Sequence, residues 1–243
     1  QCWFRLSYHR MMAVLAATFY RFPTNEMRVI AVTVTNGKTS TCNMLHAIFM
    51  EAGQKPWMLT TVNFKIGEQE FPNLNKQTTV SPFLLKGMLR KMKEARCKVV
   101  IVETTSHAMI QSRLWGVNVD TAVYTNLSQD HLSYHGTMEA YREAKGKLFA
   151  QLNTSARKSN VPKISVINQD DAEFEYFADF PVDQQFAYGI QRGTYVARDL
   201  RERADGTQFK IKIPNGEVEV DFHIPGRMNV YNAMAAATVA VAH

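Results

Sequence analysis

Short continuous apolar runs alternate along the chain with longer segments of helical periodicity, and this alternation constrains the fold more than any other feature. A strand buried on both faces is apolar throughout, and a helix between two such strands allows a right-handed parallel crossover. The pattern therefore predicts an α/β fold, a mostly parallel sheet flanked by helices. The predicted strands are residues 28–34, 57–61, 98–102, 121–125 and 163–168. The predicted helices are residues 11–22, 38–53, 82–95 and 137–152.

The pattern changes after residue 168. Short alternating runs cover residues 195–201, 208–213 and 217–222, and the dipeptides Asp205-Gly206 and Asn215-Gly216 separate them. Such dipeptides between alternating runs are typical of hairpin turns. We therefore predict a small antiparallel β-subsheet attached to the parallel core, followed by an alanine-rich helix over residues 229–242.

Length and charge narrow the class of protein. A chain of 243 residues with 46% hydrophobic residues can bury a substantial core, which predicts one large domain, or one domain with a small appendage. The formal charge is +6, but the basic residues are scattered among acidic ones. This distribution favours an anionic small-molecule site over nucleic-acid binding.

Cysteine spacing and the first residues bear on the cellular compartment. Cys2, Cys42 and Cys97 form neither a disulfide framework nor a zinc cluster, which predicts a reducing cytoplasm. Arg5 and Arg10 interrupt the apolar start of the chain, so we expect neither a signal peptide nor a membrane anchor. We expect a cytoplasmic monomer that binds no membrane.

One candidate site lies where the strand at residues 28–34 meets the following helix. The segment from Thr35 to Ser40 reads Thr-Asn-Gly-Lys-Thr-Ser. Backbone N–H groups at such a junction can hold phosphate, while Lys38 would neutralise it and Thr39 would offer a hydroxyl to Mg²⁺. Val32 occupies the place of the first glycine of a complete phosphate loop. An ordinary strand-to-helix turn therefore stays an alternative.

Two further strand ends carry polar residues. Glu103 follows the strand at residues 98–102, and His131 lies in the segment after the strand at residues 121–125. Ligands bind at the carboxyl ends of strands in open α/β sheets, and a carboxylate there suits a nucleotide-bound Mg²⁺. The alternatives are a solvated glutamate and a loop histidine. By spacing alone, Lys145 is better interpreted as a surface lysine.

These segments together resemble the Mur ligase family, most closely the branch that adds the third residue of the peptidoglycan stem peptide. The family's Gly-Thr-Asn-Gly-Lys-Thr corresponds to residues 34–39, Glu-Val-Ser-Ser-His-Ala to 103–108, and Asn-Leu-x-x-Asp-His-Leu-Asp-Tyr-His-Gly to 126–136. Its Tyr-x-x-Ala-Lys corresponds to residues 141–145, and Pro-Gly-Arg-Phe-Asn-Val-x-Asn-Ala to 225–233.

The resemblance implies an ATP-dependent amide-bond ligase. A carboxylate of a UDP-N-acetylmuramoyl-peptide attacks the γ-phosphate of ATP, and an amino acid's amine then displaces phosphate from the acyl phosphate. Two Mg²⁺ ions are implied, with Thr39 and Glu103 on the ATP-bound ion and His131 on the second. Lys145 corresponds to a lysine that the family carries as a carbamate near the second ion. Lys38, Glu103, His131 and Lys145 form the implied catalytic set.

The resemblance also assigns binding residues and domains. Thr35 to Ser40, Asn229 and Asn232 would bind ATP. The implied contacts to the UDP-muramoyl substrate are Thr78, Thr79, Ser106, His107 and Arg113. Residues 1–27 are expected to be a helical remnant of a uridine-binding domain, and residues 28–243 the central ATP-binding domain, without the C-terminal domain.

Some residues depart from the family pattern. Val34 and Ala31 replace glycines, and Ser133 replaces an aspartate. A β-branched residue is unfavourable where φ is positive, so Val34 is expected to strain or displace the loop and weaken ATP binding. A degenerate nucleotide-binding or scaffold protein is therefore one alternative. A folylpolyglutamate- or cyanophycin-synthetase-like ligase is another.

Overall fold

The computed structural model describes residues 2–73, 78–128, 135–214 and 216–243. The helices are α1 (Cys2–Phe19), η1 (Pro23–Glu26), α2 (Lys38–Glu51), α3 (Pro82–Glu94), α4 (Ser106–Ile110), α6 (Met138–Thr154), α7 (Phe174–Ala178) and α8 (Arg227–Val241). The strands are β1 (Arg28–Thr33), β2 (Trp57–Leu59), β3 (Asn63–Ile66), β4 (Gln69–Pro72), β5 (Val99–Thr104), β6 (Thr121–Tyr124), β7 (Ile164–Asn168), β8 (Gln184–Gly189), β9 (Tyr195–Arg203), β10 (Gly206–Ile213) and β11 (Gly216–Phe222).

The described strands form one sheet in the order β11-β10-β9-β8-β7-β6-β1-β5-β2-β3-β4. The strands from β9 to β2 in this order pair in parallel, which confirms the predicted α/β class. β1 lies at the centre between β5 and β6, and Val32 is in register with Glu103 and with Val123. The ends of three strands therefore meet beside the start of α2.

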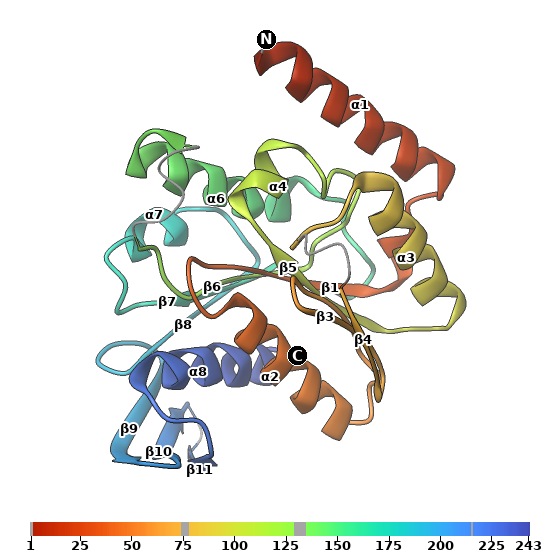
Figure 1. Ribbon diagram of the computed structural model, residues 1–243. Coiled ribbons are helices and arrows are strands. Elements are labelled where there is room, and N and C mark those ends of the chain that lie inside the picture. Colours follow the sequence, from red (N-terminus) through yellow and green to blue (C-terminus); the bar gives the residue numbers. More distant parts are fainter. Residues whose placement is uncertain (1, 74–77, 129–134, 215) are drawn as a thin grey trace.

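Helices cover both faces of the sheet and bury two cores (Figure 1). The side chains of α3, α4, α6 and α7 pack with Val29, Ala31 and Val102 on one face. Those of α2 and α8 pack with Ile30 and Val32 on the other face. Because successive residues of a strand point to opposite faces, the apolar run of β1 contributes to both cores.

Both ends of the sheet are antiparallel. The predicted hairpins around Gly206 and Gly216 are confirmed as β9–β10 and β10–β11, and β9 joins the parallel part through β8. The subsheet is therefore continuous with the main sheet. At the other end, the unpredicted strands β3 and β4 form a short hairpin with β2. Strands of four residues carry too little alternation to be recognised by pattern.

Helix α1 spans Cys2–Phe19, so it includes the opening stretch, which was expected to be a helix, and most of the helical run predicted over residues 11–22. Arg21 and Phe22 then adopt positive φ before Pro23 opens η1. In the described part of the chain, no helix is both long enough and apolar enough to cross a bilayer.

Lys86 on α3 is fully buried, and its ammonium donates to the carbonyl of Arg113 at 2.8 Å. Burial lowers the pKa of Lys86 to about 7. The unfolded chain then binds more protons than the folded one above pH 7, so stability should rise with pH. We expect the free energy of unfolding to increase by about 1 kcal/mol from pH 7 to pH 8.

Urea denaturation at the two pH values measures this increase. Lys86→Met should remove most of it, whereas the exposed Lys91 on the same helix offers a matched control, Lys91→Met, that should retain it. An equal increase in both variants would show that Lys86 is not the titrating group.

Candidate active site

The segment after β1 forms a loop whose geometry suits an anion. Gly37, at φ +91°, is the residue before α2, and no side chain caps that helix. The first N–H groups of an uncapped helix lack intrahelical partners and carry partial positive charge. A Cβ on Gly37 would lie 2.2 Å from Oδ1 of Asn232 on α8. Glycine is therefore required here for both conformation and space.

Two lysines converge on this loop. Nζ of Lys38 donates to the carbonyls of Val34 at 3.0 Å and Thr35 at 2.8 Å. Nζ of the buried Lys145, on α6, donates to the same Val34 carbonyl at 2.8 Å and lies 4.7 Å from the ring centre of Tyr141. The surface alternative for Lys145 is therefore wrong. Two cations next to an uncapped helix favour a polyanionic ligand.

Glu103 lies at the carboxyl end of β5 and is almost completely buried. Its Oε2 accepts a hydrogen bond from the Thr39 hydroxyl at 2.9 Å. Thr61 holds the same carboxylate, through its N–H to Oε2 and its hydroxyl to Oε1, both at 3.0 Å. The solvated-glutamate alternative is therefore wrong.

The oxygens of Glu103 and Thr39 are ligands of the kind that Mg²⁺ prefers, and Mg²⁺ commonly takes only one or two protein ligands beside water and phosphate oxygens. This pair of residues therefore fits an ATP-bound Mg²⁺. Within the described ranges, no group of three or more His, Cys, Asp or Glu side chains is placed to hold a metal. The predicted ligand His131 lies outside the described residues, as does Ser133.

The segment after β6 packs against the loop. Asn126 exchanges hydrogen bonds with the backbone of Asn36, its Oδ1 accepting from N–H at 3.1 Å and its Nδ2 donating to the carbonyl at 2.9 Å. The N–H of Ser128 donates to the Thr35 hydroxyl at 3.1 Å. Asp171 in turn holds this segment by accepting from the N–H of Leu127. The structure thus brings the segments that follow β1 and β6 together at the carboxyl ends of these strands.

A second cluster surrounds the start of α4. The Ser106 hydroxyl lies 2.9 Å from Nε2 of His135, and the rings of His107 and His135 lie 5.5 Å apart. His135 also lies against Tyr141, with ring centres 4.9 Å apart. Sequence reasoning assigned no role to His135, although it forms part of the His-Gly pair in the third motif.

The predicted substrate residues lie beside Glu103. The hydroxyl of Thr79 donates to the Glu103 carbonyl at 3.2 Å, and the guanidinium of Arg113 donates to the Thr79 carbonyl. The hydroxyl of Thr78 lies 2.6 Å from that of Thr61. Buried Thr79 therefore stabilises this segment, whereas Thr78 and Arg113 are only partly buried.

Helix α8 supplies the predicted adenine-side residues. Oδ1 of Asn232 accepts from the Thr41 hydroxyl at 3.3 Å, and Nδ2 of Asn229 donates to the Pro225 carbonyl at 2.8 Å. The adjacent Tyr231 donates to Asp170 at 3.0 Å. Asp170 also accepts from three successive N–H groups at Ile190, Gln191 and Arg192.

The Cys42 thiol on α2 is buried near Glu103. Burial, and then the charge of Glu103, raise the pKa of the Cys42 thiol on α2 well above its usual value. The thiol is therefore neutral at physiological pH. Ser40, in contrast, is exposed on the first turn of the same helix.

The strain predicted at Val34 is absent. Val34 is not among the residues with positive φ, and its fully buried side chain packs in the core between the sheet, α2 and α8. Ala31 is buried in the opposite core. The side chains of Val34 and Ala31 thus lie among apolar neighbours. The motif could not predict this, because a sequence motif does not specify the direction in which a side chain points.

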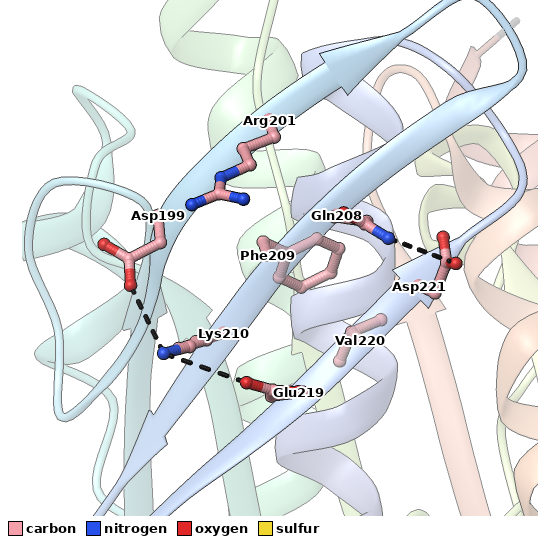
Figure 2. A pocket seen from close by; sticks show the side chains of 8 residues that line it. All are labelled: Asp199, Arg201, Gln208, Phe209, Lys210, Glu219, Val220 and Asp221. Atoms are coloured by element: carbon pink, nitrogen blue, oxygen red, sulfur yellow. Dashed lines mark hydrogen bonds and ion pairs between the residues drawn. The ribbon is translucent and has the colours of Figure 1, made fainter.

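A cavity of about 400 Å³ lies on the β9–β11 subsheet and contains none of the predicted site residues. Figure 2 shows Lys210 between Asp199, at 3.7 Å, and Glu219, at 3.8 Å. Lys210 thus pairs with a carboxylate on each neighbouring strand. This cavity is therefore separate from the candidate active site, which lies at the carboxyl ends of β1 and β5 beside α2.

Comparisons with known proteins agree with the resemblance to the Mur ligase family. A model of the Mur ligase middle domain matches residues 32–240. The UDP-N-acetylmuramoyl-L-alanyl-D-glutamate--2,6-diaminopimelate ligase of Geobacillus kaustophilus (strain HTA426) is 39% identical over 96% of this chain and 47% of its own length. The UDP-N-acetylmuramyl-tripeptide synthetase of Roseiflexus sp. (strain RS-1) is 40% identical over 95% of this chain and 47% of its own.

A solved structure of a UDP-N-acetylmuramoyl-L-alanyl-D-glutamate--2,6-diaminopimelate ligase has the same fold. Its TM-score is 0.79 at 30% identity, and the likeness covers 90% of this chain and 44% of that one. The chain thus spans about half the length of the curated relatives it matches.

Proposed function

Because the chain belongs to the Mur ligase family, we propose that it is the ATP-binding core of a ligase that joins an amino acid to a UDP-N-acetylmuramoyl-peptide. The muramoyl carboxylate attacks the γ-phosphate, giving an acyl phosphate and ADP. The amine of the amino acid then attacks the acyl carbon, and phosphate leaves. The relatives named for diaminopimelate ligation and tripeptide synthesis support this reaction class.

One observation carries the proposal. Lys38 lies at the uncapped start of α2, and Thr39, the next residue, donates to the buried Glu103 at 2.9 Å. The reaction brings two anions together, so a cation and oriented N–H groups are needed around the transferred phosphoryl group. The loop supplies both, and Thr35, Asn36 and Gly37 shape it.

The proposal includes two Mg²⁺ ions. Bound Mg²⁺ would neutralise phosphate charge, with Thr39 and Glu103 as its protein ligands and His131 toward the second ion. Lys145 is proposed to carry a carbamate, whose nitrogen keeps an N–H that can still donate to the Val34 carbonyl. The muramoyl substrate would lie along Thr78, Thr79, Ser106, His107 and Arg113, and adenine near Asn229 and Asn232 on α8.

Two observations bear on the two alternatives. The scaffold hypothesis rested on Val34, Ala31, Ser133 and the missing domains, and the positive φ expected at Val34 is absent. A folylpolyglutamate- or cyanophycin-synthetase-like activity is less compatible with relatives of about 40% identity that act on muramoyl peptides. The division at residue 27, the monomeric state and the cytoplasmic location stay predictions.

An ATP titration at saturating Mg²⁺ tests the proposal. Lys38→Ala should weaken binding by about 1.5–3 kcal/mol, because it removes a charge-assisted contact to phosphate. Lys147→Ala, which removes an exposed lysine on α6, is the matched control and should bind as the wild type does. Equal affinities for the wild type and Lys38→Ala would refute the phosphate-loop assignment.

A further inference from the structure

Glu103 is held by a residue that none of the motifs contains. Besides the Thr39 hydroxyl, its carboxylate accepts two hydrogen bonds from Thr61, one from the backbone N–H and one from the side-chain hydroxyl. We propose that Thr61 is a positioning residue that fixes the Glu103 carboxylate for Mg²⁺, and this inference rests on the proposed function.

Thr61 contacts both oxygens of the carboxylate. Its N–H lies 3.0 Å from Oε2 and its hydroxyl 3.0 Å from Oε1. Two contacts from one residue determine the rotation of the carboxylate about its last side-chain bond, which a single hydrogen bond would leave broad. The plane of the carboxylate, and thus the direction of its remaining lone pairs, depends on Thr61.

The hydroxyl of Thr61 has only one proton but two close oxygens, Oε1 of Glu103 at 3.0 Å and Oγ1 of Thr78 at 2.6 Å. An ionised carboxylate only accepts. The geometry directs the Thr61 hydroxyl at both oxygens, so its one proton is shared between Oε1 of Glu103 and Oγ1 of Thr78.

A rigid turn presents Thr61. The preceding residue, Thr60, is fully buried, and its hydroxyl donates to the Asn63 carbonyl at 2.8 Å and accepts from the Asn63 N–H at 3.1 Å. Nδ2 of Asn73 donates to the Thr60 carbonyl at 2.9 Å. These contacts hold the backbone between β2 and β3, so the N–H of Thr61 has a fixed direction.

This arrangement leaves a lone-pair position of the carboxylate for a metal ion. A carboxylate offers about four lone-pair positions. The Thr39 hydroxyl and Oε2 of Glu103, now 2.9 Å apart, can both turn to one ion, whereas the contacts of Thr61 can persist. Residues that orient a metal ligand in this way typically change metal affinity by about 10- to 100-fold when mutated.

The test measures ATP affinity twice for each variant, at saturating Mg²⁺ and in EDTA. The dissociation constant in EDTA divided by that at saturating Mg²⁺ reports how strongly Mg²⁺ and ATP support each other's binding. Thr61→Val should lower this ratio at least about tenfold and leave the affinity in EDTA close to the wild-type value. Thr61→Ser keeps the hydroxyl and should restore the ratio.

Two further variants make the result decisive. Thr104→Val is the matched control, because the Thr104 hydroxyl is adjacent in sequence to Glu103 but donates to the Val32 carbonyl; its ratio should equal that of the wild type. Thr61→Ala removes the hydroxyl without a second methyl group, and it replaces Thr61→Val if circular dichroism shows that the valine variant does not fold.

Two outcomes overturn different claims. A wild-type ratio in a folded Thr61→Val or Thr61→Ala variant, beside a wild-type protein that binds MgATP, would overturn the role of Thr61 and leave the proposed function intact. A wild-type protein that binds no ATP in either condition would overturn the proposed function, and this inference with it.

Discussion

Replacing Asp120 with asparagine should lower the free energy of unfolding by about 3–5 kcal/mol, the cost of breaking a buried ion pair. Asp120 is fully buried at the start of β6, where it binds the ammonium groups of Lys158 and, at 3.3 Å, of Lys163. It also accepts from the Val29 N–H at 2.8 Å. Asparagine would leave two buried cations without their carboxylate.

The loss should depend on pH. Burial lowers the pKa of Lys158 to about 8, although the charge of Asp120 raises it in part. Without Asp120 that pKa falls further, and the neutral amine no longer needs a carboxylate. The deficit of Asp120→Asn relative to the wild type should therefore be smaller at pH 9 than at pH 7.

Urea denaturation of both proteins at these two pH values measures the effect. Asp205→Asn, at an exposed turn where Asp205 pairs with Arg203 at 3.4 Å, is the matched control and should change stability by about 0.5 kcal/mol or less. A loss at Asp120 no larger than that of the control would contradict a structural role for this ion pair.

Replacing Val34 with glycine should lower the free energy of unfolding by about 2–4 kcal/mol without strengthening ATP binding. This expected loss combines about 1.5–3 kcal/mol for removing the buried side chain with about 0.5–1 kcal/mol for the added backbone freedom of glycine. Val34 is fully buried between the sheet and α2. Its conformation needs no glycine, since its φ is not positive.

Calorimetric ATP titration at fixed Mg²⁺ tests the binding, and urea denaturation tests the stability. Val166→Gly offers a matched control, because Val166 is buried in the same core on β7, away from the loop. Both variants should lose similar stability and bind ATP with wild-type affinity. A clear gain in affinity confined to Val34→Gly would restore the hypothesis of a strained phosphate loop.

Much of the fold was predictable because its signals are local. The apolar runs that became β1, β5, β6 and β7 identified the parallel core, and the turn dipeptides identified the hairpins of β9–β11. The motif containing Lys38 could be assigned to a strand-to-helix junction for the same reason. Strands β3 and β4 escaped prediction because four residues carry too little alternation, and β8 because its sequence begins with the exposed polar residues Gln184 and Gln185.

The sequence by itself determined which segments are strands and helices, and which strand ends carry Lys38 and Glu103. Only the tertiary structure decided that Glu103 contacts Thr39 and Thr61, that Lys145 reaches the Val34 carbonyl, and that Val34 faces a core. The reason is that hydrophobic periodicity is read within one segment. Contacts between distant segments depend instead on strand order and register, and a slip of one residue would turn each side chain to the opposite face.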